Sequence, residues 1–184
     1  MVYINPNVYI AVAILLLLIP LDWLTAAAVA AAFHEICHMG IIYVTGGTIE
    51  SINIGIGGTE IVALLNGKRK ELLAILSGPA GSFLLMGLCN IFPKLSICAC
   101  VQGLFNLLPI LPLDGGRSMQ CIFSYYWPDK IDFLQNLMVI ISAAVFVAMA
   151  IIGAFALKLG FWPIAGCVLL LLKVVLRKIP CKER

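Results

Sequence analysis

The chain has 184 residues, of which 62% are hydrophobic and 11% are charged, and its mean hydropathy is +1.09. A chain of this length cannot bury so much apolar surface in a soluble core, so the composition excludes a soluble globular protein and predicts an integral membrane protein. The net charge of +3 is small, and no basic stripe with interleaved aromatic residues precedes the C-terminal tail, which argues against nucleic acid as a partner.

Apolar stretches along the chain predict about six transmembrane helices, because a spanning helix needs about 20 mostly apolar residues. They lie near residues 6–21, 23–45, 70–92, 95–112, 134–157 and 160–177. The first and fourth are short or interrupted by proline, which a membrane tolerates where the backbone is buried in protein or lines a cavity. The N-terminal stretch lacks the basic region of a signal peptide, so we expect it to be retained. The predicted fold class is an all-α polytopic membrane protein.

The basic residues test this topology. With a cytosolic N-terminus, ten of the twelve Lys and Arg residues lie on the cytosolic side, and only Lys94 and Lys158 lie outside. This asymmetry is the one that the positive-inside rule predicts. We therefore expect a multi-pass protein of a bacterial-type cell membrane with both termini in the cytosol, and a second helix that ends toward the cytosolic leaflet.

Both histidines of the chain lie in the second predicted helix, in the run His34-Glu35-Ile36-Cys37-His38. On a helix, this i, i+4 spacing puts both imidazoles on one face, where they can hold Zn²⁺, and Glu35 can reach a metal-bound water. A glutamate between two histidines inside a membrane is costly without a function. We therefore predict a catalytic metal site; the alternatives are a polar contact between helices and a structural metal site.

A catalytic zinc usually has three protein ligands, so one more ligand must come from elsewhere in the chain. No third histidine exists, and most acidic residues are expected in loops or at helix ends. Asp114 differs because it lies between two prolines and two glycines at the cytosolic end of the fourth span, in the leaflet of the histidines. Prolines and glycines predict an unwound turn there, which can aim a carboxylate into the bundle. Asp114 is the predicted third ligand, with an Asx-type turn as the alternative.

The segment after the second span, Gly46–Thr59, contains Ile52, Ile54 and Ile56 in alternation with small or polar residues. A period of two predicts a β-strand. A glycine-bounded strand near the site could pair its free edge with an unwound substrate, as in β-strand addition. We therefore predict that Ile52, Asn53 and Ile54 bind substrate; the alternative is a packed hairpin without substrate contact.

Two motifs together resemble the site-2 protease family of intramembrane zinc metalloproteases. They are His34-Glu35-x-x-His38 and Asn106-x-x-Pro109-x-x-x-x-Asp114-Gly115. Within that family the chain is most similar to the stage IV sporulation protein FB type, a bacterial six-span group that processes a membrane-associated sigma-factor precursor. Two paired motifs are far more specific than a lone His-Glu-x-x-His.

The resemblance implies one zinc ion per chain, a general acid/base and a residue beside the substrate peptide. The matching residues are His34, His38 and Asp114 for zinc, Glu35 for the acid/base and Asn106 for the substrate contact. The family also has a membrane-embedded β-hairpin after the second helix. A third family signature, Gly-Pro-x-x-Asn, is only half present, because Ser82 stands where the family has asparagine. The motif therefore gives Ser82 no role.

The predicted function is that of an intramembrane zinc metalloprotease, which hydrolyses peptide bonds in or near transmembrane segments by attack of a zinc-bound water. The expected partners are the lipid bilayer and a transmembrane or membrane-associated protein substrate, such as a sigma-factor precursor or an anti-sigma factor. We expect one domain over residues 1–184, without a CBS or PDZ domain. Two other classes remain open: an inactive site-2-protease-like scaffold and, with less support from the few polar residues in the spans, a metal-ion transporter.

Overall fold

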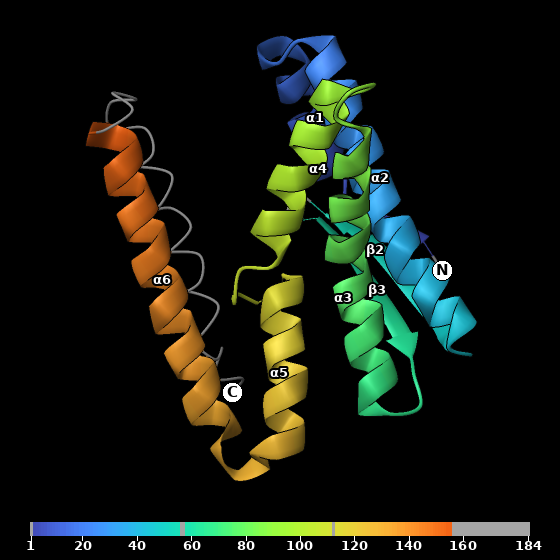
Figure 1. The fold of residues 1–184 in the computed structure, drawn as a ribbon, viewed down its shortest axis with the longest axis vertical. Coiled ribbons are helices and arrows are strands. Elements are labelled where there is room, and N and C mark those ends of the chain that lie inside the picture. The colour runs from blue at the N-terminus through green and yellow to red at the C-terminus, as the bar shows by residue number, and fades with distance from the viewer. Residues whose placement is uncertain (1, 56–57, 112, 156–184) are drawn as a thin grey trace. The chain divides into compact units, whose positions relative to one another are not determined.

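The computed structural model describes residues 2–55, 58–111 and 113–155, which fall into two compact units, Met1–Ile131 and Asp132–Arg184. The first unit contains helices and a small sheet, and α6 (Ile131–Phe155) is the described helix of the second unit (Figure 1). The helices of the first unit are α1 (Asn7–Leu18), α2 (Leu21–Val44), α3 (Lys68–Leu85), α4 (Pro93–Asn106) and α5 (Asp114–Tyr126), with short 3₁₀ turns at Met86–Leu88 and Pro128–Lys130.

Two helical segments within the described residues are long and apolar enough to cross a membrane, α2 and the continuous stretch Lys68–Leu88. With 12 and 14 residues, α1 and α4 fall short of the roughly 20 residues that a perpendicular span needs. Five of the six predicted spans correspond to α1, α2, α3, α4 and α6, and the sixth, near 160–177, lies outside the described residues. Six membrane crossings therefore stay a prediction.

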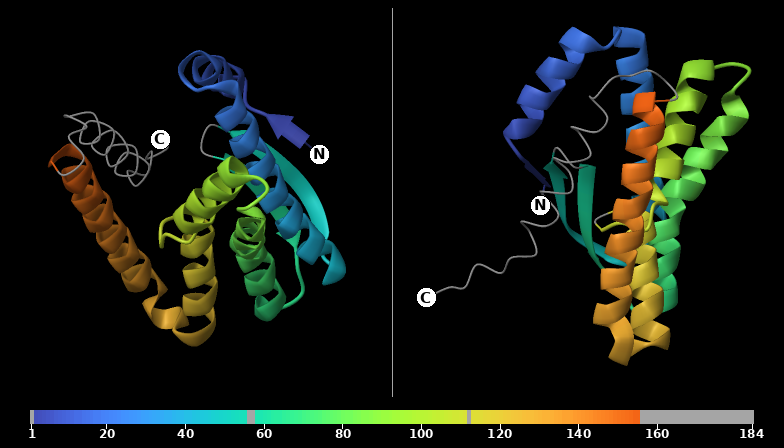
Figure 2. Two further views of the ribbon diagram at one scale, coloured as in Figure 1. Left: turned by 45° about the horizontal axis from the view of Figure 1, so that its top comes forward. Right: turned by 90° about the vertical axis from the view of Figure 1, so that its left-hand side faces the viewer.

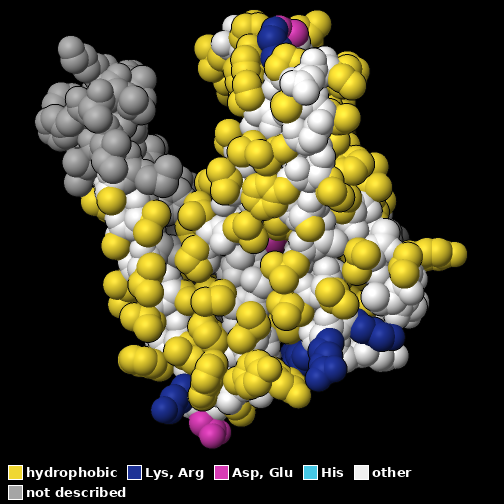
Figure 3. Space-filling model, viewed as in Figure 1, with side chains coloured by type: hydrophobic (Ala, Val, Ile, Leu, Met, Phe, Trp, Pro, Cys, Tyr) yellow, Lys and Arg dark blue, Asp and Glu magenta, His cyan; other side chains and the backbone are white. Residues whose placement is uncertain are grey.

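The helices of the first unit bury several polar side chains among apolar ones and expose many large apolar side chains. The buried face of α2 consists of Ala30, His34, His38 and Ile42, one residue every four positions. On the outside, by contrast, Tyr43 is 83% exposed, and apolar side chains cover most of the face drawn in Figure 3. Buried polar groups within an apolar exterior are typical of a bundle whose surroundings are lipid.

A three-stranded sheet lies beside α2 (Figure 1, Figure 2). Its strands are β1 (Val2–Ile4), β2 (Thr48–Gly55) and β3 (Gly58–Leu64), in that spatial order. β2 and β3 form an antiparallel hairpin in which Ile52 pairs with Ile61, and Ile61 packs in a buried cluster with Ile42 of α2 and Ala74 of α3. The hairpin after the second helix is thus present where we predict it, fixed to the two helices that also carry the polar site.

The prediction of a free edge at Ile52, Asn53 and Ile54 is wrong for this structure. These residues pair on one side with β3 and on the other with the parallel strand β1, in which Val2, Tyr3 and Ile4 face them in register. The sequence did not indicate β1, because three residues are too few to show a period and the pairing joins segments fifty positions apart.

The predicted unwound turn lies directly before Asp114: residues 107–111 and 113 are not helical, and Asp114 itself begins a helix. It is the first residue of α5, which follows the extended residue Leu113. A carboxylate in the first turn of a helix is favoured by the unpaired N–H groups and the helix dipole, which explains why a helix can begin here despite two glycines. The two glycines after Asp114 allow α5 to pack closely against the preceding loop: a Cβ at Gly116 would lie 2.6 Å from the main-chain nitrogen of Leu111.

Small residues let α2 and α3 approach each other. A Cβ at Gly81 of α3 would lie 3.0 Å from Cys37 Cβ and 3.4 Å from Phe33 Cε1 of α2. Close approach through glycine is a common way for membrane helices to pack. This contact matters for the site because α2 carries the two buried histidines and α3 contacts both of them.

We expect Gly81→Val to weaken this contact, because overpacking a filled interface costs about 1–3 kcal/mol. The thermal unfolding midpoint in detergent should fall below that of the wild type. The matched control is Gly87→Val in the 3₁₀ turn, where an added Cβ meets no atom within 4 Å. Equal midpoints for the two variants would contradict this account of α2 and α3 packing.

Candidate metal centre

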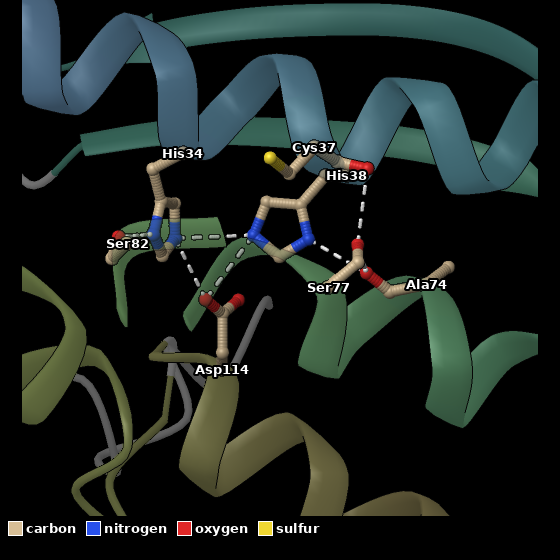
Figure 4. A network of polar contacts seen from close by, with 7 residues as sticks. All are labelled: His34, Cys37, His38, Ala74, Ser77, Ser82 and Asp114. Carbon is tan, nitrogen blue, oxygen red and sulfur yellow. Dashed lines mark hydrogen bonds and ion pairs between the residues drawn. The ribbon is translucent and has the colours of Figure 1, made fainter. Parts of the chain in front are cut away.

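Three side chains converge in the interior of the first unit: His34 and His38 from α2 and Asp114 from the start of α5 (Figure 4). Asp114 Oδ2 lies 3.0 Å from His34 Nε2 and 3.2 Å from His38 Nε2, and the two Nε2 atoms are 3.2 Å apart. All three residues are buried. The structure therefore brings together the three predicted ligands, which come from positions 80 residues apart in the chain.

Their separations suit a metal ion. Ligand atoms about 2.0–2.2 Å from a tetrahedral zinc are roughly 3.3–3.6 Å from one another. The observed 3.0 to 3.2 Å are within a few tenths of an ångström of that range. Two imidazole nitrogens and one carboxylate oxygen also form a donor set that zinc accepts. The three side chains can hold one metal ion with only a small outward movement.

The position of the proton on the His38 ring also suits a metal ion. Its Nδ1 donates to the main-chain carbonyl of Ala74 at 2.7 Å, since a carbonyl oxygen can only accept. In the neutral ring, Nε2 then carries a lone pair, which faces the carboxylate oxygen of Asp114, another acceptor. A second proton on Nε2 would form a buried ion pair with Asp114, whereas a metal ion would use the lone pairs of all three side chains. The arrangement of the three ligand atoms thus fits a metal ion.

A glycine of α3 makes room for the two rings. A Cβ at Gly78 would lie 2.6 Å from His34 Nε2 and 2.5 Å from His38 Cε1. Gly78 and Pro79 belong to the half-present family signature, so the steric need for glycine gives this part of the signature a physical reason. The sequence alone did not link Gly78 to the histidines, because that link depends on how α3 packs against α2.

Glu35 is half-buried beside the three ligands and is not one of them. It interacts electrostatically with His38, His34 and Asp114, and with the guanidinium of Arg117 one turn further along α5. Glu35 is therefore outside the ligand group, and its role as general acid/base stays a prediction. Arg117 is a residue that the motifs did not indicate.

The other predicted site residues are less closely connected with the three ligands. Asn106 is the last residue of α4 and is half-buried, eight positions before Asp114. Ile52, Asn53 and Ile54 lie in the middle strand of the sheet. The substrate-binding roles of these four residues stay predictions. In contrast, Ser82, to which the motif gave no role, lies 2.8 Å from His34 Nδ1 through its hydroxyl oxygen.

Among solved structures, the fold is similar to that of the "Site-2 Protease from Methanocaldococcus jannaschii", with a TM-score of 0.52 and 23% sequence identity. The likeness covers 78% of this chain and 72% of that one. No protein-family model matches the chain, and no curated protein matches it at a significant level. The comparison thus shows a shared fold, and any activity depends on the residues of the site.

Asp114→Ala should remove the third ligand. We expect the purified wild-type protein to contain about one zinc per chain and the variant to lose it on dialysis, since a two-histidine site is incomplete. Elemental analysis of the two proteins measures this. Asp129→Ala, which changes an exposed carboxylate just after α5, is the control and should keep its zinc. A variant that retained full zinc content would show that Asp114 is not a ligand.

Gly78→Ala should disturb the site without removing a ligand. The added methyl group must displace both imidazoles, so we expect zinc affinity to fall about 10- to 100-fold, as when ligand orientation is lost. Gly40→Ala on α2 is the matched control, because a Cβ there meets nothing within 4 Å. Competition with a chelator in detergent gives both affinities. Similar affinities for the two variants would refute the steric role of Gly78.

Proposed function

We propose that this protein is an intramembrane metalloprotease of the site-2 protease type, which hydrolyses peptide bonds in or near transmembrane segments. The observation that carries the proposal is the buried group of His34, His38 and Asp114, with Glu35 next to it. The two histidines and the glutamate lie on α2, a helix apolar enough to cross a membrane. Neither a lipid-facing helix nor a packing contact needs four such groups together. The fold likeness supports the same class of protein.

The cofactor we propose is one Zn²⁺ per chain, held by the two Nε2 atoms and the Asp114 carboxylate. When bound, zinc would supply Lewis acidity at the scissile carbonyl and at the attacking water. The same ligands accept other first-row metals, so the metal content of the purified protein also identifies the ion. With these three ligands, a bound zinc ion would have a fourth position available for water or substrate.

Glu35 is the residue we propose to move the proton. Its carboxylate would take a proton from the attacking water and later pass it to the leaving amine, a role typically worth about 10²- to 10⁴-fold in rate. Asn106, at the end of α4, is our candidate for a hydrogen bond to the substrate or to the developing oxyanion.

The substrate we propose is an extended segment of a membrane-associated protein. A helical substrate must unwind locally, because in a helix its carbonyls are hydrogen-bonded and its backbone is enclosed by side chains. Pairing with Ile52, Asn53 and Ile54 would require β1 to leave first. β1 has only three residues, all of them exposed, so its displacement would expose little buried surface. A sigma-factor precursor or an anti-sigma factor is the substrate class that the stage IV sporulation protein FB subtype would imply.

The cytosolic leaflet is the position we propose for the site. Ala74, which contacts His38, is six residues after Lys68, and six helical residues rise by about 9 Å. Basic side chains gather around the start of α3 in Figure 3, and by the positive-inside rule this end faces the cytosol. The substrate bond would therefore be cut within the membrane but close to its cytosolic surface.

Glu35→Gln is the direct test. The amide keeps the size of the side chain but cannot accept a proton, so cleavage of a single-span membrane peptide in detergent or liposomes should fall by about 10²- to 10⁴-fold. Zinc content should stay at the wild-type level, because Glu35 is outside the ligand group. The matched control is Glu71→Gln, which breaks a surface ion pair with Lys68 and should leave the rate unchanged.

Cleavage by the Glu35→Gln variant at the wild-type rate would overturn the proposed chemistry. A wild-type protein that holds zinc and binds the peptide without cutting it would instead identify an inactive scaffold. Zinc that moves across the liposome membrane without peptide cleavage would identify a transporter.

A further inference from the structure

The two histidines differ in what their Nδ1 atoms contact, although both contacts come from α3. His38 Nδ1 donates to the main-chain carbonyl of Ala74, whereas His34 Nδ1 lies 2.8 Å from the side-chain hydroxyl oxygen of Ser82. Almost any residue at position 74 would provide that carbonyl. The contact of His34, in contrast, depends on which residue occupies position 82.

Ser82 is completely buried where three helices meet. Its exposed fraction is 0%, and a Cβ at Gly103 of α4 would lie 3.1 Å from Ser82 Cβ. Small residues are common where membrane helices pack, so packing alone would explain a small side chain. Packing would not explain a hydroxyl, because alanine is smaller still and a buried hydroxyl without a partner is costly. The partner of this hydroxyl is His34 (Figure 4).

The contact bears on which nitrogen of His34 carries the proton. The ring can bind a metal through Nε2 only when Nε2 has a lone pair, and in a neutral imidazole the proton is then on Nδ1. The Ser82 oxygen can accept the hydrogen bond of that Nδ1–H and so gives the metal-binding form a buried partner at 2.8 Å. A hydroxyl can also donate, so the same contact holds the ring in place in either tautomer. Without the hydroxyl, the metal-binding form loses this partner of its Nδ1–H, and that loss is costly in a buried site.

We propose that Ser82 is a positioning residue, which holds the His34 ring in the orientation that metal binding requires and accepts the Nδ1–H of the metal-binding form. A metal-binding histidine commonly donates its second N–H to a neighbouring acceptor, and loss of that acceptor weakens the metal. The inference rests on the proposed metal centre and deepens it: α3 supports both histidine ligands, one through its main chain and one through Ser82. Ser82 does so at the position where the resembling family has asparagine.

The test compares zinc affinity among Ser82→Ala, Ser82→Thr and Ser96→Ala in the full-length protein in detergent, by competition with a chromophoric chelator. Ser96→Ala is the matched control, because Ser96 is a buried serine of α4 whose hydroxyl donates to the Leu85 carbonyl at 3.1 Å. We expect the zinc dissociation constant to rise about 10- to 100-fold in Ser82→Ala and to be unchanged in Ser96→Ala. Ser82→Thr keeps the hydroxyl and should restore tight binding.

Wild-type affinity in Ser82→Ala would overturn the inference, and so would an equal loss in Ser96→Ala, since both serines would then act only through packing. If the extra methyl of Ser82→Thr prevents folding, the comparison of the two alanine variants still decides. A wild-type protein that binds no zinc would overturn both this inference and the proposed metal centre. Zinc binding that depends on Ser82 without peptide cleavage would support this inference and contradict only the protease.

Discussion

The rest of this structure depends on the convergence of His34, His38 and Asp114 inside an apolar bundle. A buried ionisable group without a partner is costly, and in a membrane water is not available to reduce that cost. Each of the three therefore requires specific neighbours: the ligand atoms face one another at 3.0 to 3.2 Å, and both Nδ1 atoms reach α3. The close approach of α3 and the start of α5 at Asp114 are the structural consequences of satisfying these groups.

α3 connects this centre to the sheet. The Ala74 side chain packs with Ile42 and Ile61, while its carbonyl accepts the hydrogen bond from His38. Any change in the hairpin that moves Ile61 therefore acts on the same turn of α3 that orients a predicted metal ligand. The hairpin and the proposed metal centre are thus connected through one buried cluster.

Local features of this protein could be predicted from the sequence, and contacts between distant segments could not. The helical positions of His34 and His38 follow from their spacing alone, and Asp114 was found because the charge asymmetry placed it in the same leaflet. The role of Ser82 depends on how α3 is aligned against α2, which no periodicity reveals. The same is true of β1. The prolines predict the unwound residues before Asp114, but the two glycines hide the helix that starts there, because their close packing against residues 107–111 is a contact between separate segments.

The charged ends of α2 determine how deep the site can lie. At its beginning Asp22 pairs with Lys94, whose ammonium also lies 5.7 Å from the centre of the Trp23 ring, and at its end Lys70 donates to the Thr45 carbonyl at 2.8 Å. Asp22 and Thr45 are 23 residues apart, a rise of about 35 Å, which slightly exceeds the roughly 30 Å hydrocarbon layer of a bilayer. Helix α2 is therefore long enough to place both of its ends at the headgroups, even with some tilt. His38, seven residues before Thr45, then lies about 10 Å from the end of the helix, so the peptide bond of the proposed substrate would have to enter the membrane to reach it.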